Sequence, residues 1–265
     1  MRQETLRIKN IEMSYFSFGQ GARPMVILPG LDTRSVMLSA PAVESAYKMF
    51  SKDYTVYVFD RRANMPDSYT IRNMARDTAI CMRELELFDA DIFGASQGGM
   101  IAQYIAIDYP EMVHAMVLGS TLCRTNPTAE SVIYGWIDLA LRKNRRGLSE
   151  DFIDKLYSRP FAEKYGSALI ALNDQVSDRD LHRFIISAKA IFSFDCSYEL
   201  SKVQCPALVI GVEGDKVVGD KGSYDLARAL SSELYMYGRE YAHCVFDEAP
   251  DYKDRIKAFF EKNAF

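Results

Sequence analysis

The feature that most restricts the fold of this 265-residue chain is a series of short apolar runs, each ending at glycine or polar residues. Residues 25–28 stop at Pro29 and Gly30, and residues 54–59 stop at Asp60. The pattern recurs at residues 91–93, 113–118 and 206–210. Such a run is typical of a strand buried on both faces of a parallel sheet. Before these runs, alternation of apolar and polar residues on either side of Asn10 predicts an edge hairpin.

Helical periodicities lie between the apolar runs. Residues 74–87 place apolar side chains at spacings of three and four. Further helices are predicted at residues 100–107, 224–230 and 252–260. Strands that alternate with helices indicate a parallel sheet covered by helices on both faces.

One long segment interrupts this alternation. Its predicted elements are all helices, at residues 132–141, 151–156, 161–172 and 180–192. We therefore expect a core domain made of residues 1–121 and 202–265. Residues 122–201 are expected to form a helical cap inserted in that core.

Composition excludes several classes of protein. The 32 basic and 36 acidic residues give a formal charge of −4, which provides no basic surface for nucleic acid or an anionic membrane. The five cysteines are scattered and never spaced C-x-x-C, which disfavours a disulfide framework or a zinc site. The chain shows no signal-peptide pattern and no apolar run of about 18 residues. We expect a cytoplasmic protein without a membrane span or a nucleic-acid partner.

A serine flanked by glycines lies between a predicted strand and a predicted helix. Gly94, Ser96 and Gly98 form the pattern G-x-S-x-G directly after the run at residues 91–93. In this context the chain reverses sharply at the serine, and the glycines allow the close backbone approach that the turn requires. The hydroxyl of Ser96 would then be exposed at the carboxyl end of the sheet. The alternative is a glycine-rich turn with a packing role only.

A serine nucleophile needs a general base. Among the three histidines, His243 follows a predicted strand at residues 233–237 and is expected on a loop at the carboxyl edge of the sheet. His114 is expected at the start of a core strand, and His182 on a solvated helical face. We therefore predict that His243 is the base.

The base needs an acid to orient it. Asp215 follows a glycine where the predicted strand at residues 206–210 ends, so it can turn back toward the sheet edge. Glu213 and Asp220 lie in the same loop and are the alternatives. We favour Asp215.

The order Ser96, Asp215, His243 resembles that of the α/β-hydrolase superfamily, and of its capped serine hydrolases in particular. The similarity extends over nearly the whole chain. Fragments similar to those of the family occur at residues 26–30, 60–63, 75–77, 109–111 and 203–207. The resemblance implies a mostly parallel central sheet flanked by helices, with a helical cap at the position of residues 122–201.

The resemblance also implies an oxyanion hole. The sequence departs from the family at Pro29, where a histidine is usual, and at Ala63, which replaces the glycine of a D-x-R-G turn. Proline lacks only its own N–H group. The family pattern places the donors at the backbone N–H groups of Leu31 and Gln97, so the hole can be kept.

These residues together predict a serine hydrolase that cleaves a small or medium-sized carboxylic ester through an acyl enzyme. The expected partner is a small-molecule substrate with an apolar portion, and a homodimer is left open. No metal or organic cofactor is required. One alternative is a carbon–carbon bond hydrolase or acyltransferase that uses the same three residues. Another is a hydrolase-like protein that binds a ligand without turnover.

Two features of the predicted cap are interpreted less specifically. Trp136 belongs to an apolar helical face that either lines a substrate pocket or packs against a neighbouring helix. The basic residues 142–146, followed by Gly147, are interpreted as the last turn of a helix with a glycine C-cap. The alternative for that stretch is a site for an anionic partner.

Overall fold

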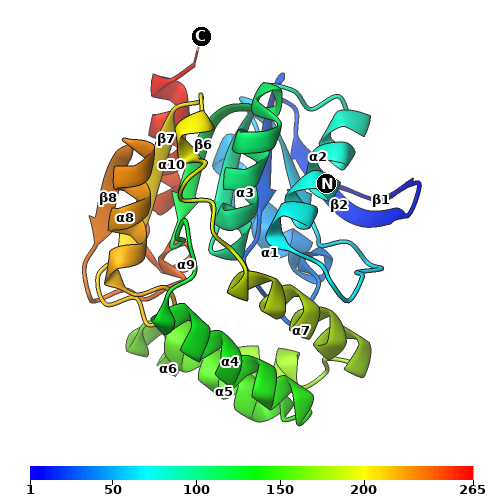
Figure 1. Ribbon diagram of the computed structural model, residues 1–265, viewed down its shortest axis with the longest axis vertical. Coiled ribbons are helices and arrows are strands. Elements are labelled where there is room, and N and C mark those ends of the chain that lie inside the picture. The colour runs from blue at the N-terminus through cyan, green and yellow to red at the C-terminus, as the bar shows by residue number, and fades with distance from the viewer. Residues whose placement is uncertain (265) are drawn as a thin grey trace.

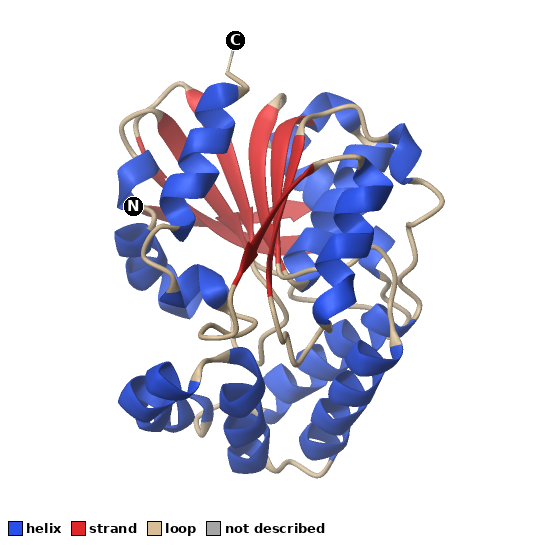
Figure 2. Ribbon diagram, turned by 90° about the vertical axis from the view of Figure 1, so that its left-hand side faces the viewer, coloured by secondary structure: helices blue, strands red, loops and turns tan. Residues whose placement is uncertain are grey.

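The computed structural model describes residues 1–264, which form an eight-stranded sheet in the order β1-β2-β4-β3-β5-β6-β7-β8. Helices cover both faces of the sheet, and a further group of helices lies beyond one end of its strands (Figures 1 and 2). The strands are β1 (Arg2–Ile8), β2 (Ile11–Gly19), β3 (Arg23–Leu28), β4 (Tyr54–Phe59), β5 (Ala90–Ala95), β6 (Val113–Gly119), β7 (Ala207–Val212) and β8 (Glu233–Tyr237).

Most neighbouring strands are parallel. Only β1 with β2 and β2 with β4 pair antiparallel within the described sheet. The β1–β2 pair is the predicted edge hairpin around Asn10, with Ile8 opposite Ile11. The predicted α/β-hydrolase fold is confirmed, with a strand at every apolar run.

The helices around the sheet form two layers. They are α1 (Ala40–Ala46), α2 (Ile71–Glu84), α3 (Gln97–Asp108), α8 (Asp220–Leu230), α9 (Val245–Glu248) and α10 (Tyr252–Lys262). Short 3-10 helices occur at η1 (Val36–Ser39), η2 (Lys48–Phe50), η3 (Pro110–Met112) and η4 (Leu200–Lys202). None of the helices within residues 1–264 is both long enough and apolar enough to cross a membrane.

The alternation of side chains along β3 explains its continuous apolar run. Val26 and Leu28 pack in one core, with residues of α2, α3 and α8. Met25 and Ile27 point to the other face and pack with residues of α1 and α10. Because both faces of the strand are buried, successive positions are all apolar.

A helical insertion, defined here as residues 122–201, connects β6 to β7. It contains α4 (Pro127–Leu141), α5 (Arg145–Leu156), α6 (Arg159–Asn173) and α7 (Asp178–Phe192). These four helices lie together at the bottom of Figure 1. All four predicted helices of this segment are present, and each begins a few residues earlier than its apolar periodicity.

The two ends of the insertion are joined by backbone hydrogen bonds. Arg124 and Asp195 form an isolated antiparallel bridge. Beside it, the N–H of Thr125 donates to the carbonyl of Phe194 at 2.9 Å. We call residues 123–125 and 194–196 the stem.

The predicted glycine C-cap at Gly147 is wrong. Gly147 lies inside α5, which starts at Arg145, and Asn144 is the N-cap of that helix. The side chain of Asn144 accepts a hydrogen bond from the backbone N–H of Gly147 at 3.0 Å. The basic stretch therefore spans the junction of two helices rather than the end of one.

Candidate active site

Ser96 occupies a strained turn between β5 and α3. Its backbone has φ 50° and ψ −119°, a left-handed conformation that non-glycine residues rarely adopt. The N–H of Ser96 donates to the carbonyl of Gly119 at 2.8 Å, which ties the turn to β6. A Cβ atom at Gly98 would overlap the carbonyl oxygen of Leu28, so only glycine fits there. The serine side chain remains partly exposed.

The loop that follows β3 lies against this turn. A Cβ atom at Gly30 would be 3.3 Å from the Cβ of Ser96 and 3.9 Å from its Oγ. Leu31 follows Gly30, and Gln97 follows Ser96 as the first residue of α3. Gly30 and Ser96 thus approach each other, and the two residues predicted to supply the oxyanion donors directly follow them in the chain.

Asp215 and His243 meet in the interior beyond the carboxyl ends of β7 and β8. The Nδ1 atom of His243 lies 2.8 Å and 3.0 Å from the two carboxylate oxygens of Asp215. Both side chains are 2% exposed. The Asp215 carboxylate also accepts hydrogen bonds from the backbone N–H groups of Val217, at 2.8 Å, and Val218, at 3.0 Å. The carboxylate of Asp215 is thus held both by the imidazole and by the backbone of its own loop.

Among the described residues, the imidazole of His243 makes no hydrogen bond with Ser96. The hydrogen bond between nucleophile and base is often long or misaligned in ligand-free sites and tightens when substrate binds. The structure therefore brings Asp215 and His243 into contact and places Ser96 at the same edge of the sheet.

The alternative acids have other partners. Glu213 accepts a hydrogen bond from the hydroxyl of Tyr224 at 2.6 Å. Asp220 accepts one from the backbone N–H of Gly214 at 2.5 Å. Neither is bonded to His243, whose carboxylate partner is Asp215 alone within residues 1–264.

The other two histidines lie elsewhere. The ring of His114 contacts Asp89 at 3.2 Å and the carbonyl of Asn263 at 2.8 Å, at the start of β6. His182 is exposed on α7.

Trp136 lies in the interior of the helical insertion. Its ring is 4.3 Å from that of Phe152 between centroids, and its Nε1 donates to Asp151 at 2.7 Å. The residue is 2% exposed. These contacts between α4 and α5 agree with the interpretation in which Trp136 packs against a neighbouring helix rather than lining a substrate pocket.

Two fragments that carried the family resemblance meet in a buried ion pair. Arg62, in the turn after β4, contacts the carboxylate of Asp77 on α2 at 3.1 Å. Their side chains are 7% and 0% exposed. This pair holds the turn in place. The preceding residue, Arg61, contacts other residues of the site.

Arg61 is a residue of the site that the sequence analysis did not single out. Its Nη2 donates to the carbonyl of Pro29 at 2.6 Å, and its Nε donates to the side-chain oxygen of Gln97 at 3.3 Å. The Gln97 amide in turn donates to the carbonyl of Ser187 on α7 at 2.8 Å. Burial lowers the pKa of Arg61 to about 10. The sequence signal that could have identified Arg61 was its position two residues after a strand, at the sheet edge where the serine was predicted.

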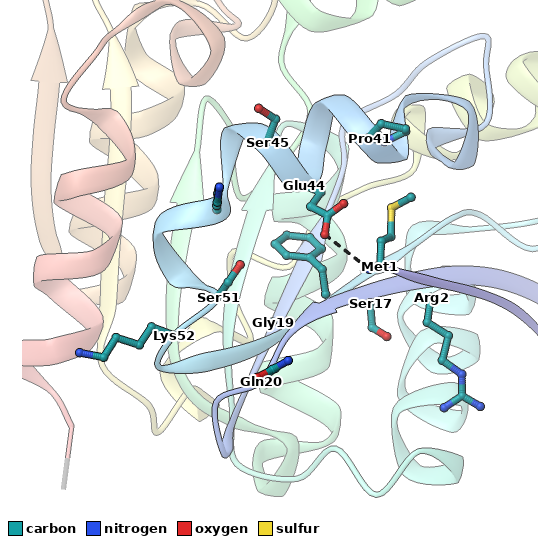
Figure 3. A pocket seen from close by; sticks show the side chains of 12 residues that line it. Met1, Arg2, Ser17, Gly19, Gln20, Pro41, Glu44, Ser45, Ser51 and Lys52 are labelled. Carbon is teal, nitrogen blue, oxygen red and sulfur yellow. Dashed lines mark ion pairs between the residues drawn. The ribbon is translucent and has the colours of Figure 1, made fainter.

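An open groove of the described surface lies away from these residues (Figure 3). It is lined by Met1, Glu44 and the segments around Gly19 and Ser51. The amino group of Met1 pairs with Glu44 at 3.5 Å. Gly19 and Ser51 precede β3 and β4, whereas Ser96 follows β5, so the groove lies toward the opposite end of the parallel strands.

The sequence also matches a known protein family. The sequence profile of the family described as "alpha/beta hydrolase fold" matches residues 23–250. The chain belongs to the α/β-hydrolase family.

Individual relatives of this α/β hydrolase are distant. It is 22% identical over 223 residues to 3-oxoadipate enol-lactonase 2 of Acinetobacter baylyi, which covers 81% of this chain and 80% of the relative. It is 24% identical over 221 residues to human serine hydrolase BPHL, covering 80% and 69%. The crystal structure of MGS-M2, an α/β hydrolase from a deep-sea metagenome library, superimposes with a TM-score of 0.87 at 23% identity, covering 97% of each chain.

Proposed function

We propose that this α/β hydrolase is a serine hydrolase that cleaves a small or medium-sized carboxylic ester. The observation that carries the proposal is the buried hydrogen bond between Asp215 and His243, at the sheet edge that also holds the strained Ser96. A buried carboxylate on Nδ1 leaves the other ring nitrogen, Nε2, as the proton acceptor. Names of relatives support the chemistry, since an enol-lactonase and a serine hydrolase are among them.

The reaction proceeds in two steps. In the first, His243 accepts the proton of Ser96 as the hydroxyl oxygen attacks the ester carbonyl, and the alcohol leaves with that proton. In the second, His243 activates a water molecule that releases the acid and restores the serine. Asp215 orients the imidazole and stabilises its charged form in both steps.

The backbone N–H groups of Leu31 and Gln97 hold the oxyanion in this proposal. Loss of one such donor typically costs about 2.7–4 kcal/mol of transition-state stabilisation. The hydrogen bond from Arg61 to the Pro29 carbonyl braces the loop just before Leu31. In this proposal the loop is held by Arg61 rather than by a histidine at position 29.

Cys244, next to the base, is a poor nucleophile in this setting. Burial raises the pKa of its thiol well above the ordinary value. A thiol that stays protonated is a poor nucleophile, which leaves the hydroxyl of Ser96 for the reaction.

The helical insertion acts as the cap of the enzyme. We assign residues 122–201 to this cap and residues 1–121 and 202–265 to the catalytic core. The hydrogen bond from Gln97 to the Ser187 carbonyl supports this role, because it brings α7 directly over the start of α3. A cap in that position limits which substrates reach the serine and excludes water from the site.

Labelling with a fluorophosphonate probe tests the proposal. We expect the folded protein to be labelled at Ser96, as located by peptide mass spectrometry, and to hydrolyse short alkyl esters. Ser96→Ala should abolish both, with heat-denatured protein as the control for non-specific labelling.

Other results would favour one of the alternative functions. Folded protein that is neither labelled nor active, but binds a ligand tightly, would overturn the proposal in favour of a non-catalytic binding protein. Identification of the products separates ester hydrolysis from carbon–carbon cleavage and from transfer to another acceptor.

A further inference from the structure

Two arginines that the mechanism does not use as reacting groups meet between the sheet and the insertion. Arg61 follows β4, and Arg183 lies on α7, separated from it by 122 residues of chain. The Nη2 of Arg183 donates to the backbone carbonyl of Arg61 at 3.1 Å. Both side chains are partly exposed, and that of Arg183 retains 19% of its surface. We call these two residues the arginine pair.

The positive charge of the arginine pair is only partly compensated. The nearest carboxylate is that of Asp60, 3.7 Å from Arg183. The same carboxylate already accepts hydrogen bonds from the hydroxyl of Ser35 at 2.6 Å and from the backbone N–H of Arg61 at 2.7 Å. Within residues 1–264, the guanidinium of Arg61 has no carboxylate within 4.0 Å. Two cations therefore lie beside a single carboxylate in a partly buried region, and only Arg183 is paired with it.

The surroundings make this imbalance unfavourable. Burial, together with repulsion by Arg183, lowers the pKa of Arg61. A partly buried cation without a partner destabilises the folded state unless another charge offsets it. Asp32, in the loop after Leu31, does not pair with either arginine. Within residues 1–264 its carboxylate accepts hydrogen bonds from the hydroxyl of Thr33 and the backbone N–H of Arg34.

Several donors of the arginine pair are unfilled. Among the described residues, the Nε of Arg183 is buried without a hydrogen-bond partner. The Nη1 atoms of Arg183 and Arg61 also donate to no group within residues 1–264. A guanidinium presents five donors in a planar fork that matches a carboxylate. The pair therefore has both the charge and the donors to bind an anion.

The arginine pair lies close to the reacting serine. Arg61 is bonded to Pro29 and Gln97, the neighbours of the proposed oxyanion residues. Arg183 precedes Ser187 by four residues on α7, which is about 6 Å along the helix axis. Because Ser187 is bonded to Gln97, an anion on the pair would lie within reach of one end of a short substrate.

We propose that Arg61 and Arg183 form a subsite for a carboxylate group of the substrate, so that the enzyme acts on esters or lactones that carry a free carboxylate. This assignment rests on the serine hydrolase function proposed above and specifies its substrate class. The carboxylate remains unchanged in the reaction, while water cleaves the ester bond to give an acid and an alcohol. The bound carboxylate anchors the substrate and offsets the positive charge of the arginine pair.

Matched substrates test the assignment at neutral pH, where the carboxylates are ionised. Monomethyl glutarate is compared with methyl pentanoate, which has the same acyl chain length. A second pair, 4-acetoxybutanoate and its methyl ester, places the carboxylate on the alcohol half. We expect kcat/KM to favour the anionic member of at least one pair by about 10- to 100-fold, the range of one or two charged hydrogen bonds.

Substitution on α7 then links the preference to the arginine pair. Arg183→Gln should reduce the ratio of kcat/KM for the anionic over the neutral ester by at least about tenfold, mainly through KM. Arg183→Lys, which keeps the charge, should restore part of it. Arg179→Gln is the control, because Arg179 is exposed one turn earlier on the same helix and should leave the ratio unchanged.

Two results would overturn the assignment. One is a wild-type enzyme that prefers the neutral ester in both pairs. The other is an Arg183→Gln enzyme with an unchanged ratio, whatever its melting temperature, since this would show a purely structural role.

Binding of free glutarate to Ser96→Ala, measured by calorimetry with and without Arg183→Gln, separates this assignment from the proposed function. Binding that weakens at least about tenfold would support the subsite even if fluorophosphonate labelling failed. Binding that is absent or insensitive to Arg183 would contradict it even if labelling succeeded.

Discussion

Three acidic residues follow β7, and their hydrogen bonds distinguish them. Asp215 is held by backbone N–H groups of its own loop and faces the Nδ1 of His243. Glu213 faces the hydroxyl of Tyr224, and Asp220 the N–H of Gly214. At the scale of single residues, the structure thus separates alternatives that sequence position alone left in the same loop.

Replacing the acid should greatly reduce turnover while leaving the fold intact. In Ser-His-Asp sites, exchange of the aspartate for asparagine lowers kcat by about 10⁴-fold, because the imidazole takes the wrong tautomer. We expect a loss of that order for Asp215→Asn in steady-state ester hydrolysis. Glu213→Gln is the matched control, since its amide oxygen can still accept from Tyr224. Equal losses in both variants would contradict the assignment of Asp215.

The residues of the candidate triad carry signals in the sequence, whereas those of the arginine pair do not. Ser96 carries a local signal, and His243 and Asp215 follow predicted strands whose carboxyl ends share an edge. Arg61 and Arg183 have no comparable signal. Their relation arises only when α7 packs over the turn after β4, and that packing depends on tertiary contacts absent from any local pattern.

At the scale of elements, the sequence predicted the interiors of helices better than their first turns. The apolar periodicity of α4 starts at Val132, but the helix begins at Pro127. Its N-cap, Asn126, accepts a hydrogen bond from the N–H of Ala129 at 2.9 Å. The first turn is held by this cap and by proline, and the only core residue that it adds is the small Ala129, so hydrophobic spacing misses it. The same applies at Asn144, where a cap signal in a basic stretch starts α5.

The turn between β5 and α3 depends on close packing of the backbone. A methyl group at Gly98 would overlap the end of β3, and a main-chain oxygen cannot move aside as a flexible side chain could. Gly98→Ala should therefore lower the free energy of unfolding by about 1–3 kcal/mol and reduce reactivity at Ser96. Urea unfolding and the rate of fluorophosphonate labelling measure the two effects.

A second glycine provides the control for this substitution. Gly135 lies in the exposed interior of α4, and a Cβ atom there would meet nothing within 4 Å. Gly135→Ala should raise the free energy of unfolding by about 0.5–1 kcal/mol through helix propensity. If Gly98→Ala proved as well tolerated as Gly135→Ala, the close approach described for the turn would be incorrect.

At the scale of the whole molecule, one buried charge should make stability depend on pH. Asp91 of β5 is 2% exposed and contacts Arg23 at 2.6 Å and the hydroxyl of Tyr54 at 3.0 Å. Its second oxygen is buried without a partner among the described residues. Burial outweighs the attraction of Arg23 and raises the pKa of Asp91 to about 6.

The sign of this effect follows from proton binding. A folded-state pKa above the unfolded value means that the folded protein binds more protons between about pH 4 and 6, so the contribution of Asp91 to stability falls as pH rises through that range. The shift of about 2 units corresponds to about 3 kcal/mol. In urea unfolding from pH 4 to 7, Asp91→Asn should therefore gain stability relative to the wild type as pH rises. Asp138→Asn, on an exposed face of α4, should give a curve parallel to the wild type. A parallel curve for Asp91→Asn would refute the raised pKa.

The stem has a consequence for how such an enzyme can diversify. Because residues 123–125 and 194–196 are hydrogen-bonded to each other, the four-helix segment begins and ends at nearly one point of the chain path. Such a segment can be lengthened, shortened or exchanged for that of another hydrolase without displacing the strands that follow. With the cap role proposed for this segment, grafting at the stem offers a route to new substrate selectivity on an unchanged chemical framework.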